Sequence, residues 1–249
     1  MNNPDAHRND DPRQAELRQA ELLQNVAAVR DRIEQACAAA GRDPADLTLI
    51  AVTKFFPVTD AIGLARCGIT DLGENRDQEA AAKAIAFSEQ APAGTPSVRW
   101  HFIGRLQTNK ARSVVRYADL VHSVDRPELA DALANAAEQA GRRLPVLVQL
   151  SLDADPDRGG STGRQLVELA DRVAGRPSLQ LSGVMAIPPV EADPDVAFEV
   201  LAGLSEQLRA EHPEAVIVSA GMSADLEAAV RHGATHLRIG TALLGRRRQ

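Results

Sequence analysis

Short apolar runs alternate with helix-like segments along almost the whole chain, and this alternation limits the fold more than any other feature of the sequence. The apolar runs cover residues 47–53, 69–72, 98–103, 120–123, 145–150, 179–185, 215–218 and 235–239. Nearly continuous runs of this length are typical of parallel strands that are covered on both faces. Segments of helical character separate them, at residues 58–67, 75–87, 108–117, 126–140, 163–174, 195–211 and 224–232.

Eight strands that alternate with helices predict an α/β protein built as a single (β/α)8 (TIM) barrel. A doubly wound open sheet would show the same alternation, and the count of eight favours the barrel. In such a barrel the chemistry is carried by residues at the carboxyl ends of the strands. These ends are therefore where we look for functional side chains.

The two ends of the chain differ from this pattern. Leu22, Val26, Val29, Ile33 and Cys37 recur at helical spacing, which predicts an extra N-terminal helix over residues 14–40. Residues 1–13 are polar and are expected to be a disordered tail, residues 14–245 to form the barrel, and residues 246–249 to form a basic tail. The polar, glycine-rich segment at 153–162 is expected to be a loop.

Charge and composition exclude several classes of function. The net charge of −6 lacks the electrostatic footprint of a nucleic-acid-binding protein. No apolar run is long enough to span a membrane, and no signal peptide is recognised. The two cysteines are expected to be reduced thiols in a cytoplasmic protein. The histidines and cysteines show no paired zinc-ligand spacing, so no metal is expected.

Lys54 directly follows the first apolar run, at the mouth of the predicted barrel. Period-two alternation places it on the same face as Ile50 and Val52. Apolar surroundings lower the pKa of an amine and make it a nucleophile for Schiff-base chemistry. The strand pattern alone favours the alternative, a solvent-exposed lysine at a strand end.

Small residues after the seventh and eighth runs predict an anion site. The segment 219–223 (SAGMS) follows a strand and precedes a helix, where backbone N–H groups can approach a phosphate. Gly240 and Thr241 could complete that site, although Ser223 would serve equally well as a helix cap. Arg238 lies in the last run and, if it faces inward, needs an acceptor. Asn75 and His101 lie near the ends of other strands, where a helix cap and a core histidine are the alternatives.

Four segments together make the signal specific: AVTK at 51–54, GENRDQE at 73–79, HFIGRLQTNK at 101–110 and SAGMSADLEAAVRHGATHLRIGT at 219–241. In this order they resemble the pyridoxal phosphate homeostasis protein family, small proteins similar to the N-terminal barrel of alanine racemase. The resemblance covers roughly residues 14–245. It implies an alanine racemase N-terminal-domain-like barrel without the C-terminal β-domain of that enzyme.

The resemblance also implies the cofactor and its ligands. Lys54 would hold pyridoxal 5′-phosphate (PLP) as an internal aldimine, Arg238 would contact the pyridine nitrogen, and Asn75 would lie near the ring. The phosphate would be surrounded by Ser219, Met222, Ser223, Gly240 and Thr241. Phe55-Phe56-Pro57 after the lysine is more apolar than in many members. This departure removes no cofactor contact.

The resemblance implies a non-catalytic protein of PLP homeostasis that holds the cofactor and delivers it to apo PLP-dependent enzymes. An arginine at the pyridine nitrogen disfavours ring protonation and weakens the ring as an electron sink. The single tyrosine, Tyr117, is expected at a helix end, so a two-base racemase lacks its second base. A low-activity PLP-dependent amino-acid racemase and a cofactor-free Schiff-base aldolase are the alternatives. We expect a monomer.

Overall fold

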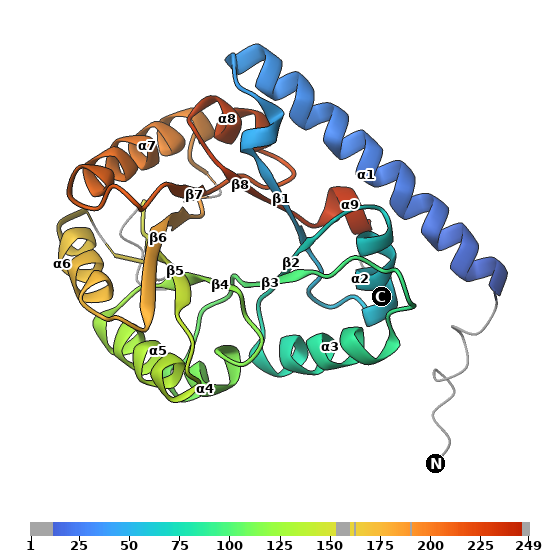
Figure 1. Ribbon diagram of the computed structural model, residues 1–249. Coiled ribbons are helices and arrows are strands. Elements are labelled where there is room, and N and C mark those ends of the chain that lie inside the picture. The colour runs from blue at the N-terminus through green and yellow to red at the C-terminus, as the bar shows by residue number, and fades with distance from the viewer. Residues whose placement is uncertain (1–11, 153–159, 162, 190, 246–249) are drawn as a thin grey trace.

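The computed structural model describes residues 12–152, 160–161, 163–189 and 191–245. Within these residues a closed, all-parallel barrel is formed in the order β1 to β8, with β1 pairing β8 to close it (Figure 1). The strands are β1 Thr48–Val52, β2 Asp71–Glu74, β3 Arg99–Phe102, β4 Leu120–Val124, β5 Leu144–Leu150, β6 Leu179–Ala186, β7 Ile217–Ser219 and β8 His236–Ile239. The predicted (β/α)8 barrel is confirmed, and the open sheet is excluded.

Helices form a ring around the barrel, as Figure 1 shows. They are α2 Val58–Arg66, α3 Asp77–Gln90, α4 Ala111–Val114, α5 Pro127–Gln139, α6 Gly163–Ala174, α7 Pro194–Glu211, α8 Leu226–Arg231 and α9 Thr241–Leu244, with two short 3-10 turns, η2 Pro44–Asp46 and η3 Thr108–Lys110. The main apolar core fills the space between these helices and the strands. Among the described helices none is long and apolar enough to cross a bilayer.

The N-terminal helix α1 (Pro12–Ala40) lies outside the ring and packs on α2, α8 and α9 (Figure 1). Its buried face contains the apolar residues that predicted the helix, among them Leu22, Val26 and Val29. The helix begins two residues before the expected boundary, at Pro12, which suits a first helical turn. Residues 1–11 and 246–249, expected as tails, lie outside the described residues.

Several boundaries differ from those expected, most of them by one to three residues. The strand expected at 69–72 begins at Asp71, because the Ile69 N–H donates to Leu64 O and so still belongs to the end of α2. The helix expected at 108–117 consists of η3 and the single turn α4. The short helix α9 was not predicted. Of the expected loop at 153–162, only residues 160 and 161 are described, and Ser161 forms a bridge to Leu150.

The inside of the barrel combines apolar and polar side chains. Leu120, Leu147 and Met185 form a small buried apolar cluster that is separate from the main core. Nine of the buried polar residues lie in the barrel strands, and five of them are Asp71, His101, His122, Ser219 and Arg238. Buried polar groups need partners, and these five are hydrogen-bonded to one another.

Candidate functional site

Lys54 lies just beyond the carboxyl end of β1 and its side chain is exposed. The alternation that places Ile50 and Val52 in the buried interior does not continue to Lys54, because β1 ends at Val52. The chain turns there, with the Phe56 N–H donating to Thr53 O at 3.0 Å. The exposed position agrees with the strand-end alternative, and it leaves the amine accessible at the barrel mouth.

The residue after Lys54 is held in a strained conformation. Phe55 has φ 67°, the left-handed region that costs a non-glycine residue about 1–3 kcal/mol and that clusters at functional sites. Its N–H donates to the Glu79 carboxylate at 2.5 Å, and the Arg76 guanidinium lies 5.0 Å from the centre of its ring. These contacts fix the direction in which the chain leaves Lys54.

A buried ion pair between Lys83 and Glu74 holds the turn that begins at Thr53. Lys83 Nζ donates to Glu74 Oε1 at 2.5 Å and to Thr53 O at 2.8 Å, and the Thr53 hydroxyl donates to the same Glu74 oxygen at 2.6 Å. Burial raises the pKa of Glu74, and the charge of Lys83 opposes that rise. The residue that precedes Lys54 is thus tied to the end of β2 and to the middle of α3.

The loops after β7 and β8 meet beside this position. The Ala242 N–H donates to Ser223 Oγ at 3.4 Å, which joins the two loops. Within the described residues, the backbone N–H groups of Ser223 and Thr241 make no hydrogen bond to the protein. Gly240 lies against β1, since a Cβ added there would be 3.5 Å from Val52 Cβ and Val52 O. Two anion donors therefore lie next to the strand that carries Lys54.

Arg238 points into the interior, where an arginine needs hydrogen-bond acceptors. Its guanidinium donates to Ser219 Oγ at 2.7 Å and to Ala186 O at 2.9 Å. Burial lowers its pKa to about 10, an effect that the charge of Asp225 partly opposes. The group therefore remains a cation at neutral pH, and within the described residues it forms no ion pair with a carboxylate.

The other predicted residues lie around the same mouth. Ser219 is the last residue of β7 and fully buried, whereas Met222 is 38% exposed in the following loop. Asn75 directly follows β2, and its Oδ1 is buried without a hydrogen-bond partner in the described structure. Gly104 passes so close to it that a Cβ would lie 2.1 Å from Asn75 O. The structure thus brings all the predicted residues to the carboxyl ends of β1, β2, β7 and β8.

Sequence reasoning missed the residues that support these groups. Asp71 and His122 belong to a buried hydrogen-bond chain that ends at Ser219, and Glu74, Glu79 and Lys83 hold the turn around Lys54. A signal was present for the first two, because each is a charged or imidazole side chain within a short apolar strand. The core-histidine alternative for His101 agrees with its burial and its two hydrogen bonds.

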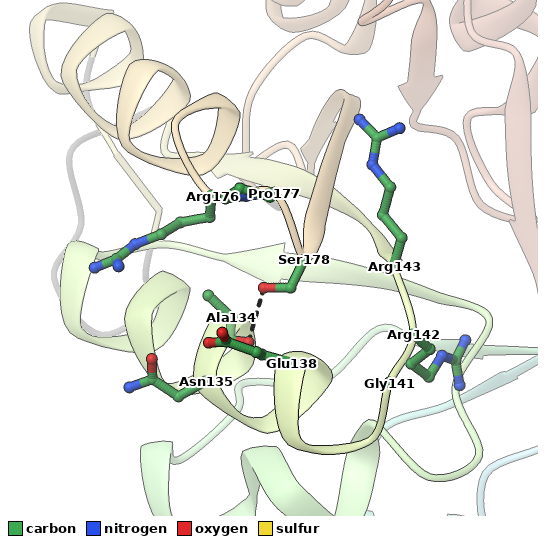
Figure 2. Close-up of a pocket in the computed structure, with 9 residues that line it drawn as sticks. All are labelled: Ala134, Asn135, Glu138, Gly141, Arg142, Arg143, Arg176, Pro177 and Ser178. Atoms are coloured by element: carbon green, nitrogen blue, oxygen red, sulfur yellow. Dashed lines mark hydrogen bonds between the residues drawn. The ribbon is translucent and has the colours of Figure 1, made fainter.

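Two clefts lie at the amino ends of the strands, away from Lys54. The cleft of about 350 Å³ in Figure 2 is lined by residues that precede β5 and β6, including Arg142, Arg143 and Arg176. Figure 2 shows the three guanidinium groups pointing in different directions. Two of them donate to main-chain carbonyls and the third pairs with Asp131, so we assign these arginines to structure.

His236 makes the stability of the fold dependent on pH. Burial, and next the charge of His101, lower the pKa of His236 to about 4, against about 6.5 in an unfolded chain. The unfolded state therefore binds a proton that the folded state excludes. Neutral His236 therefore contributes about 3 kcal/mol or less to the free energy of unfolding above pH 6.5, and this contribution is lost as the pH falls to 4.

We expect His236→Asn to flatten the decline in unfolding free energy between pH 6.5 and 4, measured by urea denaturation. Equal slopes would contradict this expectation.

The grouped amine, N–H donors and guanidinium determine which kind of ligand the site can bind. An accessible amine, donors for an anion and a buried guanidinium come from β1, β7 and β8, and β8 pairs with both other strands. Such a set suits a ligand that carries a carbonyl group and a phosphate. Geometry alone admits a phosphorylated cofactor as well as a sugar phosphate.

Comparison with known proteins identifies relatives of this chain. The family described as "alanine racemase, N-terminal domain" matches residues 22–248. A pyridoxal phosphate homeostasis protein of Mycobacterium bovis is 44% identical, covering 93% of this chain and 95% of its own, and one of Escherichia coli K12 is 37% identical over 91% and 97%. The structure of PipY of Synechococcus elongatus PCC7942 with PLP bound superposes with a TM-score of 0.78 at 30% identity, covering 90% of this chain and all of PipY.

Proposed function

This chain belongs to the pyridoxal phosphate homeostasis protein family, and from that membership we propose that it binds PLP at the barrel mouth and delivers it to other proteins. One observation carries the proposal. Lys54 follows β1, the two loops that carry the N–H donors follow β7 and β8, and Arg238 lies in β8, so all of them come from three neighbouring strands. The homeostasis relatives and the PLP-bound PipY structure support the choice of PLP over a sugar phosphate.

The residues fit the parts of PLP. When bound, PLP supplies an aldehyde for an amine and a pyridine ring that can withdraw electrons. Lys54 is the covalent anchor, and Arg238 donates to the pyridine nitrogen. Asn75, whose buried Oδ1 has no hydrogen-bond partner among the described residues, lies near the ring. The phosphate is bound by the segment 219–223 and by Gly240 and Thr241, with the N–H groups of Ser223 and Thr241 as its main-chain donors.

Two features support binding without turnover. Arg238 is a buried cation, and a cation beside the pyridine nitrogen disfavours its protonation, which weakens carbanion stabilisation. Tyr117 lies after α4 rather than after a strand, and burial raises the pKa of its hydroxyl. An acid–base partner for Lys54 is therefore not supplied by this tyrosine. Both features favour the carrier over a low-activity racemase.

The cellular setting is part of the same proposal. We place the protein in the cytoplasm as a monomer that serves apo PLP-dependent enzymes. Cys37 and Cys67 are both buried free thiols, which suits a reducing compartment. The large exposed apolar residues are distributed over several elements, including Leu17 of α1, Ile85 of α3 and Val196 of α7. Scattered residues of this kind do not require a second subunit.

A transfer assay tests the carrier function. The loaded protein, freed of unbound PLP, is mixed with an apo-aminotransferase, and the recovery of transaminase activity is followed. We expect recovery from the loaded protein and none from a sample whose Lys54 adduct has been reduced with borohydride. The carrier proposal fails if no PLP is transferred. It fails equally if the protein itself racemises or transaminates amino acids at about 1 per second or faster.

Helix α1 is expected to influence how long PLP stays bound. Asn25 donates to Leu243 O of α9 at 2.9 Å, and Arg32 donates to Ser223 O at 3.2 Å. Helix α1 therefore contacts both the segment after β8 and the loop after β7. Asn25→Ala removes one such hydrogen bond, worth about 1 kcal/mol. We expect PLP to dissociate about 3- to 5-fold faster, measured by trapping with excess apo-enzyme. Arg112→Ala, which removes a bond to Gln139 on another side of the barrel, is the control and should leave the rate unchanged.

A further inference from the structure

A continuous chain of buried polar side chains crosses the inside of the barrel. Arg238 Nη1 lies 2.7 Å from Ser219 Oγ, which lies 2.8 Å from His122 Nδ1. His122 Nε2 lies 2.9 Å from His101 Nδ1, and His101 Nε2 lies 2.8 Å from Asp71 Oδ1. All five residues are at most 4% exposed. The chain therefore joins β8 and the end of β7, through β4 and β3, to the start of β2.

The chemistry of the two ends sets the direction of every bond. Arg238 can only donate and the Asp71 carboxylate can only accept. Ser219 Oγ therefore accepts from Arg238, and the direction of its bond to His122 is set from the Asp71 end, because a hydroxyl can accept twice. With neutral rings, His101 must donate from Nε2 to Asp71, His122 must donate from Nε2 to His101, and Ser219 must donate to His122 Nδ1. Every donor then points from Arg238 toward Asp71, and each ring nitrogen in the chain is satisfied.

The charges at the two ends support this arrangement. Within the described residues Arg238 has no carboxylate partner, whereas Asp71 also pairs with Arg99 at 2.8 Å. Burial, reinforced by the charge of Arg238, lowers the pKa of His122 well below its usual range. A neutral His122 is what the one-directional chain requires. The two imidazoles thus connect a buried cation to a carboxylate that is too far away to contact it directly.

We propose that His122 and His101 are positioning residues that orient Ser219 and Arg238 for the pyridine ring of PLP by linking them to Asp71. This inference rests on the proposed function of PLP binding. The guanidinium is then held by Ser219 Oγ and Ala186 O, and its remaining N–H groups stay available for the pyridine nitrogen.

The same series of hydrogen bonds gives different roles to the residues of the segment 219–223. The single hydroxyl proton of Ser219 is committed to His122, so Ser219 has none to donate to a phosphate. Its side chain therefore serves the guanidinium, and the phosphate donors come from Ser223 and Thr241. Polar side chains that only filled the core would not need to separate guanidinium binding from phosphate binding. The neighbouring interior is filled instead by apolar residues such as Leu120 and Leu147.

The first test determines which nitrogens of the two histidine rings are protonated, in the absence of any cofactor. The apo protein is labelled with ¹⁵N-histidine, and the ring resonances are assigned with His101→Asn and His122→Asn. We expect both rings to be neutral at pH 7 with the proton on Nε2. A proton on His122 Nδ1 would reverse the bonds, free the Ser219 hydroxyl and overturn the proposal. A charged His122 ring would overturn it as well.

The second test separates a positioning role from a structural one. His122→Phe removes both hydrogen bonds, whereas His122→Asn retains an acceptor near the Nδ1 position for Ser219. We expect the phenylalanine variant to bind PLP about 10-fold more weakly while its affinity for inorganic phosphate, the second probe, stays within about twofold. The asparagine variant should recover most of the PLP affinity. Thermal unfolding of each apo variant confirms that it is folded.

The outcomes of this second test are distinguishable from failure of the proposed function. If the wild-type protein takes up no PLP, the proposed function fails, whatever the histidine tautomers are. If the wild type binds PLP but His122→Phe binds it equally well, the positioning role is overturned. A parallel loss of phosphate and PLP affinity would show a general structural effect and would also overturn it.

Discussion

Lys54→Ala is expected to abolish the yellow colour of the PLP-loaded protein and to weaken PLP binding by about 100-fold or more, equivalent to about 3 kcal/mol. The lysine is exposed at the end of β1, so its removal leaves no cavity in the core. We expect the unfolding free energy of the apo protein to change by less than about 0.5 kcal/mol, as is usual for surface substitutions. The affinity is measured by absorbance titration with PLP.

The lysine content of the chain provides a matched control for this variant. The sequence contains three lysines, Lys54, Lys83 and Lys110. Lys83 is buried against Glu74, whereas Lys110 lies in η3 after β3. Lys110→Ala should therefore retain both the colour and the affinity. Full colour in Lys54→Ala, or its loss in Lys110→Ala, would show that the anchor has been misassigned.

Lys83→Met is expected to destabilise the fold by about 3–5 kcal/mol, because it leaves the Glu74 carboxylate buried without its cation. Glu74 is 1% exposed, and its second oxygen already lacks a hydrogen-bond partner in the described structure. In a domain of this size the loss corresponds to a decrease in melting temperature of about 10 °C. The measurement is urea denaturation of the apo protein at pH 7.

A second substitution shows whether the unpaired charge causes that loss. Adding Glu74→Gln to Lys83→Met removes the carboxylate, so the double variant should be more stable than the single variant by about 1 kcal/mol or more. Glu79 would still accept the Phe55 N–H in both variants. A double variant that is less stable than Lys83→Met would contradict an ion-pair explanation.

The barrel could be predicted because its signals are local. Each strand is a short apolar run, and the helix expected at 163–174 is observed as Gly163–Ala174. One boundary was wrong because the hydrogen bond that ends a helix decided it. The N–H of Ile69 is taken by the end of α2, so β2 begins two residues later than its apolar run suggests.

The positions of the candidate site residues could be predicted from the sequence, whereas the side chains that support them could not. Lys54, Ser223 and Thr241 lie in segments with a recognisable order of small and charged residues. Asp71 is 30 residues before His101, which is 21 residues before His122, and the three meet only because the closed barrel directs them inward. Likewise, period-two alternation predicted an inward Lys54, but β1 ends at Val52 and the strained turn at Phe55 directs the lysine to the mouth.

Reductive trapping of PLP on the purified protein tests the central claim most directly. The protein is incubated with PLP, reduced with borohydride and digested, and the peptides are identified by mass. We predict a visible absorption band that reduction removes, with one pyridoxyl group found on the peptide that contains Lys54. A protein that shows no band after incubation with PLP, or that carries the group on Lys83 or Lys110 instead, would contradict this account.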